Sequence, residues 1–265
     1  YMVGRRVVIL GSGDIGLIMA RRMTLEGAKV LACVELMPYS SGLTRNIVQC
    51  LNDYDIPLYL SHTITDIRGH DRVEQVTVSE VGPDRRPIPG TEMVFDCDTV
   101  LLSVGLIPEN ELTRGAGSGA QVRENMETSV PGIFACGNVL HVHDLVDYVS
   151  AESERAGAAA AAYVLAGQTE PDVPAVALKN GEGVTYTVPQ LIRPGPQPKP
   201  AEVFFRVNRV TKAAAILVRD GTGKEVARFR RGHLAPGEME HITLPAAALQ
   251  EALSPLTVSI EEVPQ

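Results

Sequence analysis

Residues 6–16, with the sequence RVVILGSGDIG, decide the fold. The first five are largely apolar and β-branched, as in a strand that is buried on both faces of a parallel sheet. Three glycines with the spacing Gly-x-Gly-x-x-Gly follow directly, and apolar residues then recur at helical intervals as far as Gly27, which suits the end of a helix. Residues 29–35, KVLACVE, have the composition of a second buried strand. The first 35 residues therefore predict a strand–helix–strand unit.

The three glycines have separate tasks when a loop of this kind binds a dinucleotide. Gly11 permits a tight turn, Gly13 lets the backbone approach a pyrophosphate, and Gly16 allows the helix to pack closely on the strand. The free N–H groups at the helix N-terminus then face the phosphates. We predict that the whole loop binds the cofactor, through Gly11, Ser12, Gly13, Asp14, Ile15 and Gly16.

An acidic residue stands at the end of the second strand. Glu35 lies nineteen residues after Gly16. A carboxylate in this position accepts hydrogen bonds from both ribose hydroxyls and repels a 2′-phosphate, which favours NAD over NADP. Arg45 is the residue that could accommodate a 2′-phosphate, but it lies ten residues further on, inside the next predicted helix.

The strand–helix alternation continues and then gives way to shorter segments. A helix is predicted at about 43–54 and a strand at 57–60. Alternating segments separated by turn residues then predict an antiparallel meander, at 63–67, 72–81 and 92–95. Residues 98–105 read as another buried strand.

A second module begins at Gly105. It comprises a loop, a strand at 132–136 and an alanine-rich helix at about 144–165. Beyond residue 168 proline and glycine are frequent, which predicts a stiff, extended spacer. The last part of the chain alternates in the manner of short strands separated by turns, which predicts a small β-sandwich, with strands at 203–207, 215–220, 225–229, 241–244 and 256–261.

The predicted fold class is α/β, with a Rossmann-like three-layer domain, part of a second domain and a small β-sandwich-like domain. The predicted division is an NAD-binding domain at 1–102, a C-terminal segment of an FAD-binding domain at 103–168, a linker at 169–201 and a β-rich domain at 202–265. The first strand of the β-rich domain is also consistent with a start near 183.

Composition excludes several classes of partner. The formal net charge is −8, so we expect neither nucleic acid nor an anionic membrane surface as partner, because both need a basic patch. No apolar run reaches the roughly 18 residues that cross a bilayer, and no signal peptide is visible. The four cysteines are scattered and form no Cys-x-x-Cys pair, which predicts reduced thiols and a cytoplasmic location.

Three separate segments share their order with a known family. They are 7–16 (VVILGSGDIG), 97–112 (CDTVLLSVGLIPENEL) and 128–138 (TSVPGIFACGN). In this order they resemble the pyridine nucleotide-disulfide oxidoreductase-like flavoproteins, in which the NAD domain is inserted into the FAD domain. The resemblance covers about residues 1–167 and implies both FAD and NAD as cofactors.

The resemblance also assigns tasks to the second and third segments. Gly105, with Pro108 and Asn110, matches the family's return crossing into the FAD domain. The third segment is similar to the one that holds the ribitol and pyrophosphate of the flavin. The residues that it implies as flavin-binding are Gly137, Asn138 and Val139.

The chain departs from the family pattern in several places. Asn138 stands where the family has aspartate, and residues 115–122 are several residues shorter than the usual hairpin. The family's first FAD fingerprint should precede Tyr1, so we expect that a further N-terminal segment belongs to this protein. A redox-active cysteine pair is also absent, which indicates the disulfide-free branch or a disulfide in that preceding part.

A group of polar residues follows the flavin motif, namely His141, His143, Asp144 and Asp147. They lack a third and fourth metal ligand with known spacing, so we predict no metal site. The resemblance places the start of the following helix near the flavin ring. Either histidine then contacts the flavin, or both serve helix capping and surface solvation. The isolated histidines read as ordinary surface or strand residues: His62, His70, His233 and His241.

These observations predict an FAD-dependent NAD(H) oxidoreductase that passes hydride between nicotinamide and flavin, and then electrons to a small molecule or a partner protein. The alternative is a nucleotide-binding module or electron-transfer subunit without activity of its own. No catalytic acid or base is identified. The C-terminal β domain carries no chemical motif, and we expect it to serve homo-oligomerisation or the docking of a partner subunit.

Overall fold

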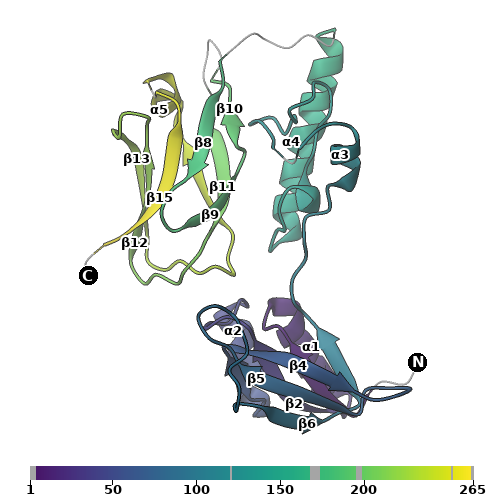
Figure 1. Cartoon of the computed structure of the whole chain (residues 1–265). Helices are drawn as coiled ribbons and strands as arrows, with labels where there is room; N and C mark the ends of the chain where they lie inside the picture. The colour runs from purple at the N-terminus through teal and green to yellow at the C-terminus, as the bar shows by residue number, and fades with distance from the viewer. Residues whose placement is uncertain (1–3, 120, 168–173, 195–198, 252, 264–265) are drawn as a thin grey trace. The chain divides into compact units, whose positions relative to one another are not determined.

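The computed structural model describes residues 4–119, 121–167, 174–194, 199–251 and 253–263 (Figure 1). The chain divides into two compact units, Tyr1–Gly105 and Leu106–Gln265. The first unit contains the predicted dinucleotide-binding loop. The second contains the predicted flavin segment together with the β domain.

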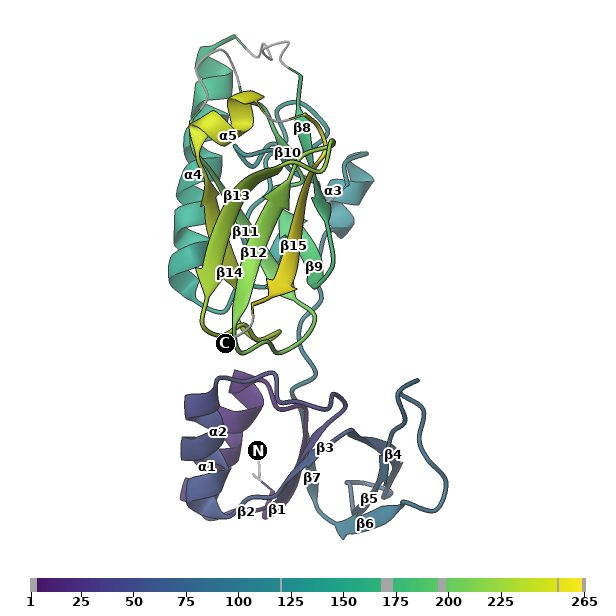
Figure 2. The same cartoon turned by 90° about the vertical axis from the view of Figure 1, so that its left-hand side faces the viewer.

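The first unit is built around a parallel sheet of four strands in the order β3-β2-β1-β7. Two helices cover one face of this sheet, and an antiparallel meander of three strands, β4-β5-β6, lies on the other (Figure 2). The strands are β1 (Arg6–Leu10), β2 (Lys29–Glu35), β3 (Leu58–Leu60), β4 (His62–Arg68), β5 (Gln75–Glu80), β6 (Met93–Asp96) and β7 (Thr99–Leu102). The helices are α1 (Asp14–Leu25), α2 (Thr44–Cys50) and the short 3₁₀ helix η1 (Asn52–Tyr54).

Alternation along the strands explains the three layers. Val7 and Ile9 of β1 pack against α1, and the intervening Val8 packs with Val76 and Val78 under the meander. Because side chains on a strand point to opposite faces in turn, a strand covered on both sides must be apolar throughout. The Rossmann-like three-layer prediction is confirmed, although the expected single helix over 43–54 is broken at Leu51 into α2 and η1.

The second unit begins with the predicted flavin segment. Its elements are α3 (Glu111–Gly115), the 3₁₀ turn η2 (Gly137–Val139) and the long helix α4 (Val146–Leu165). The strand predicted at 132–136 is wrong, because within the described residues only an isolated bridge between Phe134 and Glu127 forms there. A single isolated bridge does not provide the repeated hydrogen bonds that define a strand.

The β domain is a sandwich of two sheets that share one core. A five-stranded sheet in the order β10-β8-β15-β12-β13 faces a three-stranded sheet, β14-β11-β9. The core draws its largest buried side chains from both sheets, among them Phe205, Ile216 and Ile242. The elements are β8 (Val176–Asn180), β9 (Val184–Val188), β10 (Leu191–Ile192), β11 (Ala201–Val207), β12 (Ala214–Arg219), β13 (Glu225–Arg231), β14 (Glu240–Leu244), α5 (Ala246–Glu251) and β15 (Leu256–Glu262).

The linker predicted at 169–201 is wrong for most of its length. Strands β8, β9 and β10 lie within it and supply members of both sheets. Their register explains the error: β8 pairs in parallel with the last strand, β15, about eighty residues away, and β9 pairs with β11. Partners so distant leave no local signal among the glycines and prolines that dominate the segment. Two of the prolines in this segment, Pro196 and Pro198, lie outside the described residues.

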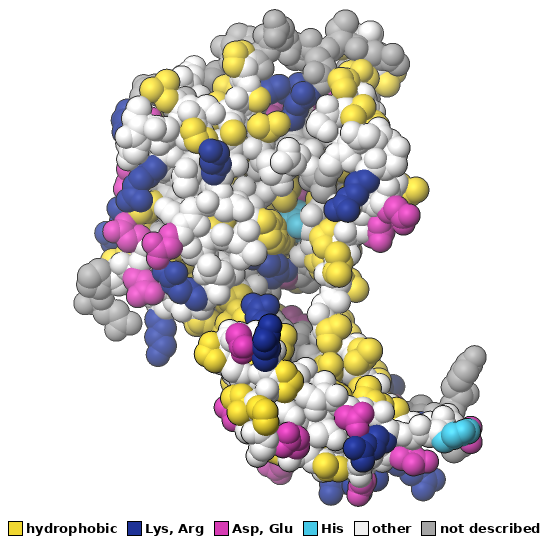
Figure 3. Space-filling model, viewed as in Figure 1, with side chains coloured by type: hydrophobic (Ala, Val, Ile, Leu, Met, Phe, Trp, Pro, Cys, Tyr) yellow, Lys and Arg dark blue, Asp and Glu magenta, His cyan; other side chains and the backbone are white. Residues whose placement is uncertain are grey.

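The exposed surface carries charges of both signs. On the face drawn in Figure 3, basic and acidic side chains are interspersed on both units. Within the part of the chain that the structure describes, no helix combines the length and apolarity needed to cross a membrane.

Candidate functional site

The glycine-rich loop connects β1 to α1 in a backbone shape that requires glycine twice. Gly11 has a φ of +100°, and a Cβ atom there would lie 2.0 Å from the carbonyl oxygen of Ser103. A Cβ on Gly16 would lie 2.6 Å from the carbonyl oxygen of Gly11. These contacts are closer than real Cβ atoms make. The backbone after β7 therefore excludes a side chain at Gly11, and the close approach of α1 to the loop excludes one at Gly16.

The third glycine stands in a different environment. A Cβ on Gly13 would meet nothing nearer than the hydroxyl of Ser41, at 3.7 Å. Gly13 is also the N-cap residue of α1 and has no side chain with which to cap the helix. The amides of the first turn are thus left to a ligand, in a place where the helix dipole favours negative charge. This arrangement fits the pyrophosphate of a dinucleotide.

Glu35 is held beside the loop by three hydrogen bonds. Its Oε2 accepts from the backbone N–H of Ser12 at 3.0 Å and from the Ser12 hydroxyl at 2.6 Å, and its Oε1 accepts from the N–H of Met37 at 2.9 Å. Glu35 is 7% exposed and Ser12 is fully buried. An ionised carboxylate has about four acceptor positions, so capacity for a ribose hydroxyl remains. Glu35 therefore both fixes the loop and offers its charge at the end of β2.

Asp14 stabilises the same loop from the helix side. Its Oδ1 accepts from the N–H of Leu43 at 2.9 Å and from the side-chain amide of Asn46 at 2.7 Å. The hydroxyl of Ser40 donates to the carbonyl of Ser12 at 3.0 Å. Sequence reasoning missed Ser40 and Asn46, because their contribution depends on the chain after β2 folding back over the loop.

Ile15 stands apart from these contacts. It is the second residue of α1 and its side chain is 70% exposed. An apolar side chain so open on the ligand-facing turn has room to lie against a bound nucleotide. The structure thus brings Gly11, Ser12, Gly13, Asp14, Gly16 and Glu35 together around one loop and leaves Ile15 at its rim.

The predicted flavin residues form a separate group in the second unit. Gly137 has a φ of +69° and is buried, and its N–H donates to Oε2 of Glu152. Asn138 is exposed, and its Oδ1 accepts from the N–H of His143 at 3.4 Å. Val139 is half-buried. Glu152 therefore holds the turn from the protein interior, and Asn138 is exposed to solvent. An exposed amide in this place fits a hydrogen bond to a hydroxyl of the flavin's ribitol.

Gly105 stands at the boundary between the two units. Its φ is +90°, and no atom lies within 4 Å of the position that a Cβ would occupy. Here glycine is required by the backbone conformation alone and not by close packing.

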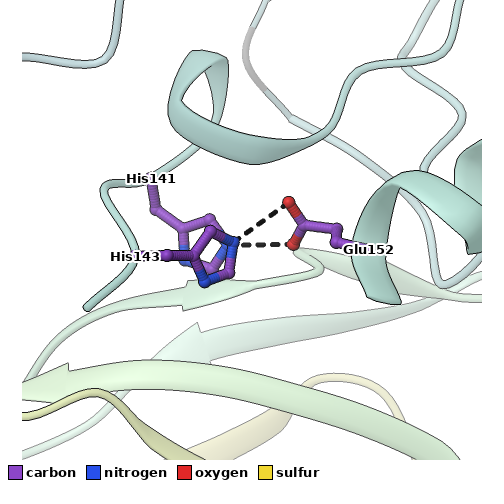
Figure 4. A group of neighbouring side chains, drawn as sticks. All are labelled: His141, His143 and Glu152. Carbon is purple, nitrogen blue, oxygen red and sulfur yellow. Dashed lines mark hydrogen bonds and ion pairs between the residues drawn. The ribbon is translucent and has the colours of Figure 1, made fainter. Parts of the chain in front are cut away.

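The polar cluster after the flavin motif differs from its prediction. Nε2 of His141 lies 2.9 Å from Oε1 of Glu152, and Nε2 of His143 lies 3.2 Å from Oε2 (Figure 4). All three side chains are at most 2% exposed. The two histidine rings meet edge to face, with their centroids 4.1 Å apart. Neither histidine is therefore a solvated surface residue.

Glu152 is the member of this cluster that sequence reasoning missed. It lies nine residues after His143, on the second turn of α4, and only the folding of the intervening loop brings it back to the histidines. Burial alone raises the pKa of its carboxyl, but hydrogen bonds from His141, His143 and the Gly137 N–H outweigh burial and lower the pKa to about 2. The carboxylate is thus a buried anion with three donors.

Asp144, which the sequence places with the histidines, points elsewhere. It pairs with Arg206 of β11 and accepts from the backbone N–H of Met239. Arg206 also donates to the carbonyl of Val142 at 3.0 Å. The start of α4 is therefore anchored to the β domain.

The remaining histidines and the cysteines agree with their predictions as ordinary residues. His70, His233 and His241 are exposed and His62 is half-buried. All four cysteines are free. Burial, together with the nearby Glu35, raises the pKa of the Cys33 thiol to about 12. Such a thiol stays protonated and unreactive at neutral pH.

Comparison with known proteins identifies the first 160 or so residues. The family model described as pyridine nucleotide-disulphide oxidoreductase matches residues 2–163. The chain belongs to this family. The resemblance drawn from the three sequence segments is thereby confirmed, and the family implies FAD and NAD(P)H as cofactors. Residues 164–265, which include the β domain, lie outside the match.

Individual relatives are similar over the same part of the chain. An NADH oxidase of Methanocaldococcus jannaschii is 29% identical over 153 residues, which are 54% of this chain and 31% of that protein. An NAD(P)H sulfur oxidoreductase (CoA-dependent) of Pyrococcus abyssi is 31% identical over 160 residues, which are 55% of this chain and 33% of that protein. The chain thus spans about a third of the length of these relatives.

A solved structure gives the same result for the fold. The thioredoxin reductase of T. acidophilum superposes with a TM-score of 0.52 at 26% sequence identity, over 60% of this chain and 53% of that one. The α/β fold class with a Rossmann-like parallel sheet is thus supported independently of the sequence motifs.

Proposed function

We propose that this chain is part of an FAD-dependent oxidoreductase that uses NAD(H) and passes electrons on to a small molecule or a protein. When both are bound, nicotinamide and flavin supply the hydride chemistry. The observation that carries the proposal is the loop between β1 and α1, where two glycines exclude side chains and a third leaves the helix amides open beside Glu35.

The chain's own residues bind and orient the cofactors in this proposal. The amides of the first turn of α1 hold the pyrophosphate, and Gly13 leaves the space for it. Glu35 hydrogen-bonds the adenosine ribose, and Asp14 keeps the following loop closed over the glycines. Gly137, Asn138 and Val139 hold the flavin at its ribitol end, with Gly105 in the crossing between the two units. No residue here is assigned to proton transfer.

The negative charge of Glu35 selects NADH over NADPH, because a 2′-phosphate would lie against it. The name of the Pyrococcus abyssi relative, with NAD(P)H, covers both cofactors. The proposed preference for NADH therefore rests on Glu35 of this chain and not on that relative. Unpaired cysteines suit a reducing compartment, and we include a cytoplasmic location in the proposal. The names of the relatives favour an oxidoreductase over an electron-transfer subunit without activity.

Calorimetric titration with NADH and NADPH tests the nucleotide half. We expect NADH to bind and NADPH to bind more weakly. Glu35→Gln keeps a hydrogen-bonding group but removes the charge, and should narrow the difference between the two cofactors. Glu74→Gln, an exposed glutamate in the same unit, is the control and should leave the preference unchanged. Folded protein that gives no heat with NADH or NAD⁺ at millimolar concentration would contradict the proposal.

The flavin half has its own measurement. Anaerobic addition of NADH to protein that has been supplied with FAD should decrease the visible absorbance of the flavin. Asn138→Ala should weaken FAD retention, because it removes the exposed amide at the turn. Protein that binds NADH but never retains or reduces FAD would limit the function to nucleotide binding.

A further inference from the structure

His141, His143 and Glu152 bring together three groups that metals use as ligands. One atom from each side chain lies within 4.8 Å of the others. Figure 4 shows both imidazole rings directing a nitrogen toward the same carboxylate, from the loop on one side and from helix α4 on the other. Among the described residues this is the group of His, Cys, Asp and Glu side chains that converges in such a way.

The separations of the ligand atoms suit a single ion. Two ligand atoms bound roughly 2.0–2.2 Å from a metal, at tetrahedral or octahedral angles, lie roughly 2.9–3.5 Å from each other. The distances from the carboxylate oxygens to Nε2 of His141 and of His143 are 2.9 and 3.2 Å. These two distances go to different oxygens of the carboxylate, and the three ligand atoms lie within 4.8 Å of one another. The side chains would therefore draw together around an ion.

The chemistry of the ligands also suits a metal. The side chain of Glu152 is 1% exposed and supplies two carboxylate oxygens. Each histidine ring supplies Nε2 as a ligand in the tautomer that carries its proton on Nδ1. Two imidazoles and one carboxylate suit a divalent transition metal such as Zn²⁺ or Fe²⁺ and not Mg²⁺ or Ca²⁺, which prefer oxygen ligands alone. The fold already buries these side chains, so metal binding does not have to remove them from water.

Hydrogen bonding alone leaves this cluster incomplete. Nδ1 of both rings is buried and has no hydrogen-bond partner among the described residues. Buried polar atoms are nearly always paired, so two unpaired nitrogens in one cluster need an explanation. Both lie on the side of the ring away from Glu152, which Nε2 faces. The two nitrogens also lack the partners that usually orient metal-bound histidines, and the loss of such partners lowers metal affinity about 10- to 100-fold.

We propose that His141, His143 and Glu152 form a buried site for one divalent transition-metal ion, which ties the loop of η2 to helix α4. Glu152 supplies the third ligand that was not found from the sequence, and for lack of which no metal site was predicted. The missing partners at Nδ1 make the site moderate in affinity and not of the tight structural type. The proposal goes beyond the proposed function and does not depend on it, because the binding of either cofactor is no part of its test.

The experiment uses the whole chain, freed of metal with a chelator. Zn²⁺ is titrated by calorimetry, and Co²⁺ is added to a second sample because its visible absorption reports imidazole and carboxylate ligands. We expect one ion per chain and a rise in the thermal unfolding temperature with Zn²⁺, since a ligand that binds the folded state stabilises it.

Two variants and a control locate the ion. Glu152→Gln keeps an oxygen for the Gly137 N–H, and His143→Gln leaves the carboxylate in place, so they weaken the site by different routes. Each removes a ligand, so it should lower Zn²⁺ affinity by more than the roughly 10- to 100-fold that the loss of a ligand's hydrogen-bond partner causes, and it should remove the thermal shift. His241→Gln, an exposed ring that stacks on Phe204 outside the cluster, should bind as the wild type does.

Three results would overturn the proposal. They are a wild-type chain that binds no Zn²⁺ or Co²⁺, a Co²⁺ spectrum without signs of ligation by the protein, and equal Zn²⁺ affinity in wild type, Glu152→Gln and His143→Gln. The first two do not require any variant to fold. A wild-type chain that binds Zn²⁺ but not NADH would contradict the proposed function and leave the metal proposal standing.

Discussion

The loop after β1 and the turn after residue 136 both use buried glutamates, but in opposite ways. Glu35 accepts hydrogen bonds from Ser12 and Met37, and these donors fix its carboxylate beside the loop while leaving room for a further donor. Glu152 receives its hydrogen bonds from two histidines whose second nitrogens have no partner among the described residues. The first arrangement is carried by the backbone, and the second by side chains that converge from separate elements. The stability of the second should therefore depend more heavily on one residue.

Removing the Glu152 carboxylate should have the largest effect. Glu152→Ala leaves both histidines and the Gly137 N–H without their acceptor in a buried position, and should cost about 3 kcal/mol or more of unfolding free energy. Urea denaturation in the presence of a chelator measures it. The control is Glu154→Ala, an exposed glutamate two residues further along the same helix. Equal stability of the two variants would show that the cluster is not the support of the turn.

A side chain on the glycine loop should have the next largest effect. Gly11→Ala places a Cβ against the Ser103 carbonyl at a φ of +100°, and strain and overpacking together should cost about 2–5 kcal/mol. Gly223→Ala, at a φ of +87° with no atom within 4 Å, carries only the strain and should cost about 1–2 kcal/mol. NADH titration and urea denaturation of both variants separate the two causes. A Gly223 variant as unstable as the Gly11 variant would argue against the role of close packing.

The ion pairs of Glu127 provide a pH-dependent comparison within the second unit. Glu127 is 2% exposed. Burial raises the pKa of its carboxyl, but the hydrogen bond from Gly132 and the charges of Arg193 and Arg123 outweigh burial and lower the pKa below the ordinary value of 4.5.

A depressed pKa in the folded state means that the stabilisation is complete above the unfolded value and is lost as pH falls through the folded value. We therefore expect stability to decline below about pH 4.5, and the Glu127→Gln variant to lack part of this decline. Unfolding free energies measured between acid and neutral pH test this. Identical slopes in wild type and variant would place the titration on other carboxyls.

Thiol reactivity should give the smallest effect and compares the two units directly. Cys33 is fully buried in the first unit, and its pKa is raised to about 12, whereas Cys136 in the second unit is half-buried. At neutral pH iodoacetamide should label Cys136 in folded protein and leave Cys33 unmodified, as mass spectrometry can show. Cys136→Ser should remove most of the labelling. Rapid modification of Cys33 would mean that the sheet of the first unit opens readily.

The dinucleotide-binding loop could be predicted residue by residue because its requirements lie in the backbone. The glycine spacing indicates where a Cβ is excluded, and at both Gly11 and Gly16 a Cβ would meet backbone atoms at too short a distance. Strand periodicity likewise predicted β1 and β2, since burial on both faces demands an apolar run. The roles of Asn46 and Ser40 could not be predicted, because they arise only when the chain folds back on the loop.

The second unit was less predictable for a related physical reason. Glu152 joins His143 through the reversal of the chain before α4, and no periodicity encodes that reversal. The parallel pairing of β8 with β15 joins segments about eighty residues apart, so β8 was taken as part of a linker. Strands that pair with a strand close by in the sequence, such as β12 with β13 across a tight turn, were predicted correctly.

The hydrogen bonds across the second unit determine where this protein can be divided. Val122 accepts backbone N–H groups from Gln190 and Leu191 and donates its own N–H to the Gln190 side chain. Arg206 of the β domain grips the loop at Val142, and Arg155 of α4 pairs with Glu202. An excision made where the family match ends, near residue 163, would sever all of these at once. The β domain and the segment before it are therefore one compact unit, and chimeras should exchange the two together.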